Sequence, residues 1–324
     1  MVRQLAASEP ETARKALQGL AFYETAARGP GREPRPVAAE HKGVAIRDCG
    51  GAGPPAILVP SLINPPSVLD LDREVSLAQA IAAMGRRALL LDWGEASARS
   101  ELDIAGHVDH RLVPLLERIG EPAALVGYCL GGTMAIAAAN LVPVERVATL
   151  AAPWAFSGYP DEARSALLAL WRAAGPAAQS LHALPMEVLQ SAFWSLDPRR
   201  TVAKFARLAE LDPASPEARR FVALEDWANH GEPLPLPAAR ELIEDLFAAD
   251  FPGGGRWRVG GRPISDALDV PVVHCTATND RITPAATAAR GERRQFPAGH
   301  VGMVVGSARR ELHAALKGFL TPCR

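Results

Sequence analysis

The amino-acid sequence predicts an α/β fold, in which a mostly parallel sheet has helices on both faces and a mostly helical insertion interrupts the alternation. Short apolar runs alternate with helical stretches between about residues 42 and 160, and again near the C-terminus. Runs that are apolar throughout are typical of parallel strands buried on both faces. Between the two regions the alternation of strands and helices stops, and residues 161–264 are predicted to form helices without a clear strand.

The first region contains strands and helices in regular order. A helix-forming segment at residues 11–27 comes before it and breaks at the Pro/Gly-rich sequence "RGPGREPRP". Apolar runs then predict strands, and the stretches between them predict helices. The strands are expected at residues 56–60, 88–93, 123–127 and 146–153, and the helices at 76–85, 107–120 and 131–142.

This pattern also predicts the domain organisation. Residues 1–41 would form an N-terminal helix and a linker, and residues 161–264 a helical cap. The core would combine residues 42–160 with residues 265–324. In its second part we expect strands at 269–280 and 293–297, and a helix at 307–320.

Composition excludes several classes of function. The 324 residues carry a net charge of -1, which gives no field that would attract nucleic acid. The 4 cysteines form no CxxC pair, which suits a reducing compartment and indicates no metal site. We find neither a secretory signal nor an apolar run of about 20 residues that could span a membrane. A cytoplasmic protein is therefore expected.

The sequence "LVGYCLGGT" at residues 125–133 has the spacing of a nucleophile elbow, the sharp turn between a strand and a helix that exposes a nucleophile. Cys129 takes the nucleophile's position, and Gly127 and Gly131 are the small residues that such a turn needs on either side. The helix that follows would place partial positive charge beside an anionic sulfur. The alternative is a buried structural cysteine, since free cysteine is among the most buried residue types.

A general base and an orienting acid should follow the nucleophile in the chain. Asp280 lies just beyond a predicted strand, and His300, flanked by Gly299 and Gly302, follows the next one. Catalytic groups gather at the carboxyl ends of the strands in open α/β sheets. The order Cys129, Asp280, His300 therefore favours a catalytic triad and, with the elbow, the α/β-hydrolase fold.

In this triad His300 would take the thiol proton, Asp280 would hold the imidazole, and the sulfur would attack an acyl carbonyl. An oxyanion hole needs two N–H donors. One would be the backbone N–H of Leu130, directly after the nucleophile. The other would come from the loop "VPSLIN", near Leu62 or Ile63, and we take Ile63 as the candidate.

These motifs resemble those of the polyhydroxyalkanoate synthases, particularly the short class III type that works with a separate partner subunit. The similar stretches cover most of residues 45–306. They are "ILVPSLINPPSVLDL", "ALLLDWG", "LVGYCLGGT", "FVALEDWANHGEPLP", "RWRVGGRPISDALDVPVV" and "GHVGMVVG". The chain departs from the family pattern at Arg281, where a histidine is usual, and at Ala155 and His230, where an aspartate is usual.

The resemblance implies a reaction and its partners. It implies transfer of (R)-3-hydroxyacyl groups from coenzyme A thioesters to Cys129, and then to the hydroxyl of a growing polyester chain. Coenzyme A would be part of the substrate, so no cofactor is expected. A homodimer and a complex with a separate partner subunit are the two expected assemblies, and polyester granules in the cytoplasm are an expected location.

Three functions remain open. The first is acyl transfer of the polyester-synthase type. The second is a hydrolase with the same triad, a thioesterase or polyester-cleaving enzyme in which water resolves the acyl-enzyme. The third is a catalytically weak homologue with a structural or granule-binding role. A cysteine nucleophile favours transfer, because its thioester is close in energy to the coenzyme A thioester.

Other polar residues have simpler interpretations. His107 and His110 lie three places apart on a predicted helix, and we interpret them as an exposed helix face rather than a metal site. Cys49 and Cys323 are expected near the surface.

Overall fold

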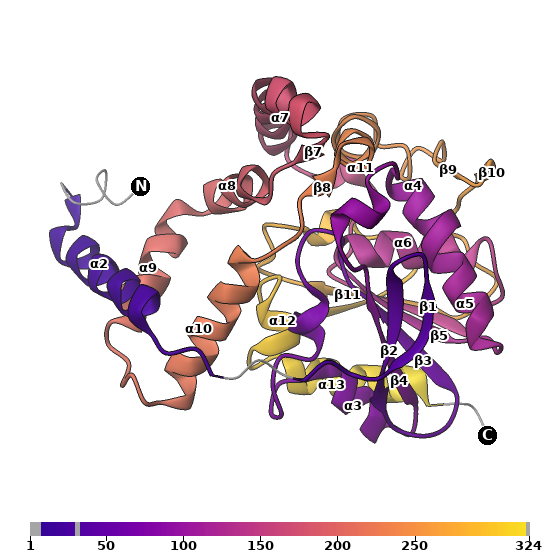
Figure 1. Cartoon of the computed structure of the whole chain (residues 1–324), viewed down its shortest axis with the longest axis horizontal. Helices are drawn as coiled ribbons and strands as arrows, with labels where there is room; N and C mark the ends of the chain where they lie inside the picture. The colour runs from indigo at the N-terminus through magenta and orange to yellow at the C-terminus, as the bar shows by residue number, and fades with distance from the viewer. Residues whose placement is uncertain (1–7, 30–32, 322–324) are drawn as a thin grey trace. The chain divides into compact units, whose positions relative to one another are not determined.

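The computed structural model describes residues 8–29 and 33–321. The chain forms two compact units, which are described separately (Figure 1). One comprises Met1–Glu33 and Glu187–Gly231, and the other comprises Pro34–Met186 and Glu232–Arg324. The middle of the predicted cap thus belongs to the same unit as the N-terminal helix, and its two ends belong to the unit with the sheet.

The described part of the larger unit contains a sheet of eight strands in the order β1-β2-β4-β3-β5-β6-β11-β12. β1 pairs antiparallel with β2, and β2 with β4, whereas every other pair is parallel. The mostly parallel sheet that the sequence predicts is confirmed. The strands are β1 (Val37–His41), β2 (Val44–Gly50), β3 (Pro55–Val59), β4 (Arg87–Asp92), β5 (Ala124–Tyr128), β6 (Arg146–Leu150), β11 (Val272–Ala277) and β12 (Glu292–Phe296).

Strands β1 and β2 were not predicted. They form a hairpin whose two turn residues, Lys42 and Gly43, both have positive φ angles, 49° and 80°. This turn geometry matches the twist of the flanking strands. β1 lies at the edge of the sheet with mostly exposed residues, so it lacks the continuous apolar run by which strands such as β3, β4 and β5 were found. It falls within residues 1–41, which we expected to form a helix and linker.

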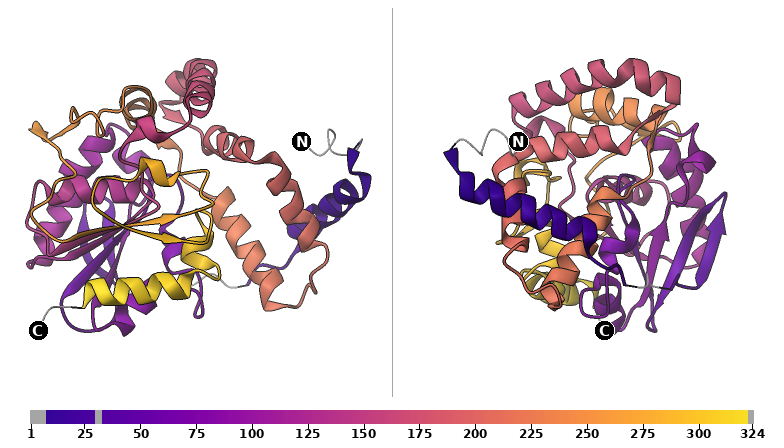
Figure 2. Two further views of the ribbon diagram at one scale, coloured as in Figure 1. Left: turned by 180° about the vertical axis from the view of Figure 1, so that it is seen from behind. Right: turned by 60° about the vertical axis from the view of Figure 1, so that its left-hand side comes forward.

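Helices cover both faces of this sheet (Figures 1 and 2). On one face, α3 (Leu77–Ala83) packs beside α13 (Arg309–Leu320). On the other, α6 (Leu130–Ala139) contacts β5 and β6 and packs against the helical segment that precedes β5. Every residue from Leu130 to Ala138 is buried, because α6 is hydrophobic around its whole circumference.

The helix expected at residues 107–120 has an irregular middle. It begins as α4 (Ile104–His107), continues through a π-helical segment, η3 (Val108–Leu112), and ends as α5 (Val113–Ile119). Gly120 terminates it with a φ of 81°. His107 is fully buried, so its interpretation as part of an exposed helix face was wrong, whereas His110 is exposed.

The insertion contributes further elements to the larger unit. A 21-residue helix, α7, contacts a π-helical segment, η5, and two pairs of very short strands lie nearby in the chain. Cys49, expected near the surface, is buried, and Cys323 lies outside the described residues. The elements are η4 (Phe156–Gly158), α7 (Asp161–Leu181), β7 (Ala183–Leu184), β8 (Leu234–Pro235), α11 (Leu236–Arg240), η5 (Glu241–Ala248), β9 (Arg258–Val259) and β10 (Arg262–Pro263).

The smaller unit is helical. Its elements are α2 (Pro10–Thr25), α8 (Met186–Leu196), α9 (Pro198–Leu208) and α10 (Pro216–Asn229). α2 packs closely on α9 at Gly19, where an added Cβ would lie 1.9 Å from the Phe205 carbonyl oxygen. The Tyr23 hydroxyl also donates to Asp226 in α10, at 2.8 Å. The N-terminal helix is thus an integral part of this unit.

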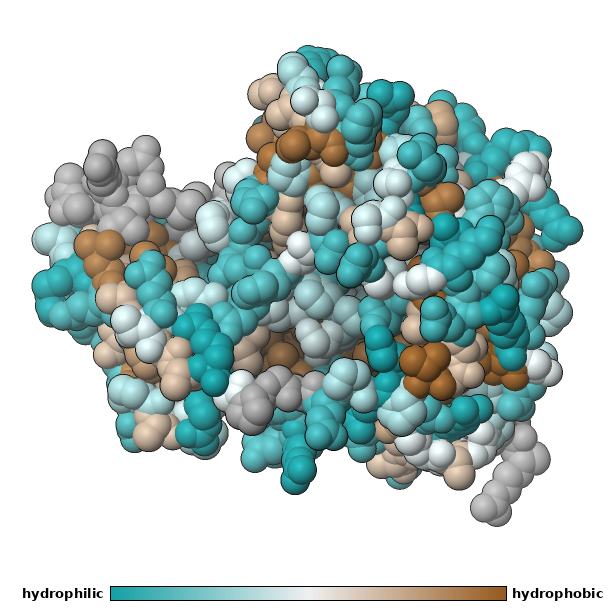
Figure 3. Space-filling model, in the orientation of Figure 1, coloured by the Kyte–Doolittle hydropathy of each residue, from teal (hydrophilic) through white to brown (hydrophobic). Residues whose placement is uncertain are grey.

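Within residues 8–29 and 33–321, no helix combines the length and the apolar character needed to cross a membrane. On the face drawn in Figure 3, hydrophobic residues are scattered among hydrophilic ones. The large hydrophobic side chains exposed in the described chain are Leu17, Leu20, Val37, Leu181 and Trp194.

Candidate active site

The structure brings together the three residues that the sequence predicts as a triad. Cys129 follows β5, Asp280 lies beyond the end of β11, and His300 lies beyond the end of β12. Nδ1 of His300 lies 2.8 Å from Oδ2 of Asp280. The Cys129 side chain lies near enough to the same imidazole to contribute to its raised pKa. All three belong to the larger unit, so no motion between the units is needed to assemble them.

The turn at Cys129 has the steric character of an elbow. Cys129 has φ 55° and ψ -132°, a combination that is costly for a residue with a side chain. A Cβ at Gly127 would lie 2.4 Å from Gly132 Cα, and one at Gly131 would lie 2.1 Å from the Val59 carbonyl oxygen. Only glycine fits at these two positions, so the turn packs directly against β3 and projects the thiol from the sheet edge.

Asp280 is buried and its carboxylate is fully engaged. Oδ1 accepts hydrogen bonds from the backbone N–H groups of Ile282 and Thr283, both at 2.8 Å. Oδ2 accepts from the Thr283 hydroxyl at 2.8 Å and faces His300. Burial raises the pKa of Asp280, but the charge of His300 and these hydrogen bonds outweigh it, and the pKa is lowered overall. The carboxylate is therefore ionised at neutral pH.

Thr283 is a site residue that the sequence analysis missed. Its hydroxyl lies 2.9 Å from the Ala151 carbonyl oxygen and 3.1 Å from His300 Nδ1, in addition to its contact with Asp280. It thereby ties the loop after β11 to the end of β6. The signal was the spacing Asp-x-x-Thr at residues 280–283, a pattern in which an aspartate caps the turn that follows it.

His300 is buried between the acid and the thiol. Burial lowers the pKa of His300, but the charges of Asp280 and Cys129 outweigh it and raise the pKa to about 10. The Tyr128 ring packs beside the imidazole, with 5.1 Å between ring centroids. An imidazole in this position is held firmly and, with a pKa of about 10, carries a proton at neutral pH.

The two oxyanion-hole candidates lie on separate segments. Leu130 is the first residue of α6, where backbone N–H groups have no partner within the helix. Ile63 is buried in the loop after β3, and its N–H donates to Ser61 Oγ at 3.3 Å. The oxyanion role of Leu130 and Ile63 stays a prediction.

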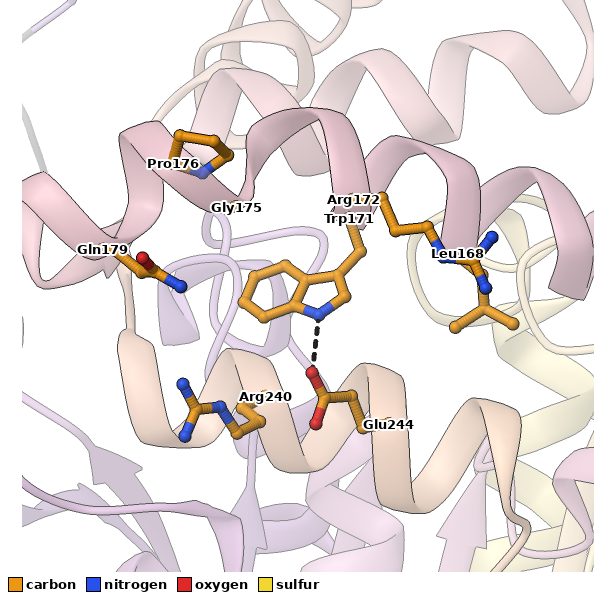
Figure 4. Close-up of a pocket in the computed structure, with 8 residues that line it drawn as sticks. All are labelled: Leu168, Trp171, Arg172, Gly175, Pro176, Gln179, Arg240 and Glu244. Atoms are coloured by element: carbon orange, nitrogen blue, oxygen red, sulfur yellow. Dashed lines mark hydrogen bonds between the residues drawn. The ribbon is translucent and has the colours of Figure 1, made fainter.

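A groove of about 470 Å³ lies between α7 and the α11–η5 segment, apart from the three site residues (Figure 4). The Trp171 indole projects from α7 across this groove and donates to Glu244 Oε1 at 2.8 Å. The other residues that line it are Leu168, Arg172, Gly175, Pro176, Gln179 and Arg240.

No model of a known protein family matches the chain. Curated proteins do match it. A "Poly(3-hydroxyalkanoate) polymerase subunit PhaC" from Allochromatium vinosum is 27% identical over 290 residues, which cover 82% of this chain and 80% of that protein. The protein of the same name from Haloferax mediterranei is 26% identical over 247 residues, 71% of this chain. The chain resembles the polyhydroxyalkanoate polymerase subunits. The resemblance predicted from the sequence motifs is confirmed.

The relatives differ from the chain in length. The match covers only 49% of the Haloferax mediterranei polymerase subunit, and 61% of the one from Haloarcula marismortui. The activity of the polymerase subunits, their substrates and their partners are therefore proposals for this chain.

Solved structures with a similar fold include a hydrolase and a lipase. A hydrolase from Pseudomonas aeruginosa has a TM-score of 0.52 at 18% identity, and covers 86% of this chain and 94% of its own. A monoacylglycerol lipase from Paleococcus ferrophilus has a TM-score of 0.51 at 16% identity, with 86% and 97% coverage. At these identities the likeness concerns the fold alone. The α/β-hydrolase fold predicted from the sequence is confirmed.

Proposed function

We propose that the protein is an acyltransferase of the polyhydroxyalkanoate-synthase type, which uses a covalent Cys129 acyl-enzyme. One observation carries this proposal. A cysteine stands at the elbow of an α/β-hydrolase fold and influences the pKa of His300, whose Nδ1 is held by the buried Asp280. The similarity to polymerase subunits supports a hydroxyacyl coenzyme A thioester as the substrate.

Before the first half-reaction the thiol proton passes to His300, which holds it because its pKa is near 10, and the sulfur then attacks the carbonyl carbon of the (R)-3-hydroxyacyl thioester. The negative oxygen that forms is stabilised by backbone N–H groups, for which Leu130 and Ile63 are the candidates. The bond between carbonyl carbon and coenzyme A sulfur then breaks, and coenzyme A leaves with the proton from His300. Asp280 holds the imidazole and stabilises its charged form throughout.

In the second half-reaction the terminal hydroxyl of a polyester chain attacks the acyl group on Cys129. His300 accepts the hydroxyl proton while the new ester bond forms, and returns it to the Cys129 sulfur as the thioester bond breaks. The chain gains one hydroxyacyl unit and the free thiol is restored. Since the thioester on Cys129 is close in energy to the coenzyme A thioester, the intermediate can persist until an alcohol arrives.

A hydrolase with the same triad is the second candidate. Water would then take the place of the polyester hydroxyl and release a free hydroxy acid. The departures at Ala155 and His230 favour this alternative, because the family has carboxylates there. A catalytically weak structural homologue is a third candidate, which the assembled site residues disfavour.

The remaining expectations belong to this proposal. No cofactor is required, because the chemistry uses only the three side chains and the thioester substrate. A homodimer or a complex with a partner subunit would be the working assembly, with the growing polyester bound to it. Its place would be the cytoplasm, at the surface of polyester granules.

The proposal is tested by incubating the protein with 3-hydroxybutyryl-CoA, with and without a candidate partner subunit, and measuring free thiol and acyl products. We expect thiol release with polymer formation, and loss of both in Cys129→Ala. Thiol release with only free hydroxy acid would support the hydrolase instead. No turnover with either preparation would support the structural homologue.

A further inference from the structure

The carboxyl end of β4 lies against the loop that would supply an oxyanion donor. Trp93 directly follows β4 and is only 4% exposed. Its indole N–H donates to the Pro60 carbonyl oxygen at 3.1 Å. Pro60 begins the segment of residues 60–63, here called the oxyanion loop, which directly follows β3, the parallel neighbour of β4.

The same carbonyl is confined from the other side by the nucleophile elbow. A Cβ at Gly131 would lie 2.5 Å from the Pro60 carbonyl oxygen, so the first turn of α6 is in close contact with it. Pro60 has no N–H and a fixed φ angle, so its carbonyl contacts decide how the next peptide group is turned. The Pro60 carbonyl oxygen thus contacts both the Trp93 indole N–H and the helix turn that carries Leu130.

The Trp93 ring has a rigid support. The His107 ring meets it edge-on, with centroids 5.8 Å apart. His107 is itself fixed at both nitrogens, with Nδ1 2.6 Å from the Asp103 carbonyl oxygen and Nε2 3.2 Å from Arg99 Nη1. Burial lowers the pKa of His107 to about 3, so the ring is neutral at ordinary pH and one nitrogen can accept from the buried Arg99.

We propose that Trp93 is a positioning residue for acyl transfer, and that its indole N–H holds the oxyanion loop at the correct distance from Leu130 N–H. This inference rests on the proposed role of Cys129 as the acylated nucleophile. It adds a residue that would not touch the substrate and would act through the Pro60 peptide group. Loss of the Trp93 indole N–H should slow only those reactions that develop an oxyanion.

Two reactions of Cys129 distinguish a positioning role of Trp93 from a role in packing alone. Acylation by p-nitrophenyl acetate forms an oxyanion and is followed by release of the chromophore. Alkylation by iodoacetamide displaces iodide from carbon and forms none. In Trp93→Phe, which keeps a ring but loses the donor, we expect acylation to fall about 10-fold or more. Alkylation should stay within about twofold of wild type, because His300 and Asp280 are unchanged.

Trp257→Phe is the matched control. Trp257 is also a buried tryptophan whose indole N–H donates to an oxygen, Glu241 Oε1 at 2.7 Å, away from the oxyanion loop. We expect both rates to stay within about twofold in this variant, since losing one buried hydrogen bond affects stability rather than the oxyanion. Cys129→Ala supplies the background of both reactions.

Three results would overturn the inference. They are unchanged acylation in Trp93→Phe, an equal fall of both reactions, and an equal fall of acylation in Trp257→Phe. If Trp93→Phe does not fold, benzothienylalanine at position 93 replaces the N–H by sulfur in a ring of the same shape, and the same expectations apply.

The proposed function and the inference can fail separately. A wild-type protein that is acylated by p-nitrophenyl acetate but leaves 3-hydroxybutyryl-CoA untouched contradicts the proposed function, while Trp93 can still be tested. If wild-type Cys129 accepts no acyl group from either reagent, both are wrong.

Discussion

At the level of single residues, Thr283 connects the acid, the base and the end of β6 through one hydroxyl group. In Thr283→Val the shape is kept and the hydroxyl is lost, so either Asp280 or the Ala151 carbonyl, whichever accepts from the single O–H, loses a buried donor. The cost of one such unsatisfied group is about 1–3 kcal/mol. We therefore expect kcat/KM with 3-hydroxybutyryl-CoA to fall about 10-fold or more.

Thr283→Ser is the control for this prediction, since it keeps the hydroxyl, and it should retain most of the activity. Equal losses in both variants would mean that the methyl group, and not the hydroxyl, matters at this position.

The Asp280–His300 pair predicts a particular dependence of stability on pH. The charges of Asp280 and Cys129 outweigh burial and hold the pKa of His300 near 10, above its ordinary value of 6.5. A raised pKa stabilises the folded state fully below pH 6.5, and this contribution is lost as the pH rises through about 10. Asp280→Asn removes the larger of the two causes, so its free energy of unfolding should decline less than that of wild type between pH 6.5 and 10.

The measurement is urea unfolding at several pH values, with Asp266→Asn as control. Asp266 pairs with Arg290, and since the pKa of Asp266 is lowered and that of Arg290 raised, both stay charged across this range. The free energy of unfolding of Asp266→Asn should therefore change with pH in the same way as that of wild type. If the free energy of unfolding of Asp280→Asn also changed in this way, the raised pKa of His300 would be contradicted.

How much of the site the sequence could predict depended on chain order. Cys129 stands in a recognisable motif, and Asp280 and His300 follow two strands in the order that the fold requires. Thr283 and Trp93 act through backbone carbonyls of distant segments, and no local pattern records which carbonyl a hydroxyl or an indole will meet. Sequence spacing predicts the reacting groups better than the residues that hold them.

At the level of secondary-structure elements, the contact of α6 with β3 should tolerate no added atom at Gly131. Gly131→Ala would place a Cβ 2.1 Å from the Val59 carbonyl oxygen, and the helix must shift away from the strand. Overpacking of this kind costs about 1–3 kcal/mol of stability. We expect a lower thermal midpoint, measured by circular dichroism, together with slower acylation of Cys129.

Gly318→Ala tests whether this effect is specific to the contact. Gly318 lies exposed in α13, and a Cβ there meets nothing within 4 Å. Alanine in an exposed helix is more stable than glycine by about 0.5–1 kcal/mol. If glycine mattered at Gly131 only through helix propensity, Gly131→Ala would raise the stability as Gly318→Ala does.

The π-helical segment η5 carries a second buried carboxyl group, Glu241. It accepts from Trp257 Nε1 at 2.7 Å and from the Ala105 N–H at 2.9 Å. Burial outweighs these bonds and raises the pKa of Glu241 from 4.5 to about 7. The folded state therefore loses stability as the pH rises from 4.5 through 7. In Glu241→Gln this loss should vanish, so the urea midpoint of the variant should rise relative to wild type across that range.

If the difference in urea midpoint between Glu241→Gln and wild type stayed constant from pH 4.5 to 7, the raised pKa of Glu241 would be contradicted. Absolute stability is a poorer test, because the two donors meet different oxygens of Glu241, and in glutamine one of these oxygens is replaced by an NH2 donor.

Among the elements, the sequence predicted most readily those whose burial is complete. β3 and β5 are buried at every residue and were found from apolar runs. β1, at the sheet edge, was missed because its residues are mostly exposed and show no apolar run. The π-helical turns of η3 and η5 were missed because a one-residue insertion in the hydrogen-bond ladder hardly changes the apolar periodicity.

At the level of the whole molecule, the two compact units should respond separately to damage. Gly19→Ala would force α2 away from α9, since a Cβ at this position meets the Phe205 backbone. We expect faster amide hydrogen exchange in residues 10–25 and 198–229, because the smaller unit opens more often. Exchange in β3, β5 and β6 should stay unchanged, and so should the alkylation rate of Cys129.

Gly29→Ala is the control for this prediction, since an added Cβ there meets nothing within 4 Å. Faster exchange throughout the sheet in Gly19→Ala would mean that the two units unfold together.

The predicted insertion also shows what sequence alone could not resolve at this scale. Loss of the strand–helix alternation marked residues 161–264 as different from the core. It could not show that the helix at Pro10–Thr25 packs with residues 187–231, because that packing joins segments nearly 200 residues apart. The composition of a helix does not show which other helices it packs against.

The insertion leaves the sheet after β6 and returns to it at β11, and these two strands are direct neighbours, with Val147 paired to Val272. The segment between β6 and β11, which is more than a third of the chain, therefore begins and ends at one pair of neighbouring strands. Evolution can lengthen, shorten or exchange such a segment without altering the strand register on either side. The strands that precede Cys129, Asp280 and His300 would keep their places under such changes.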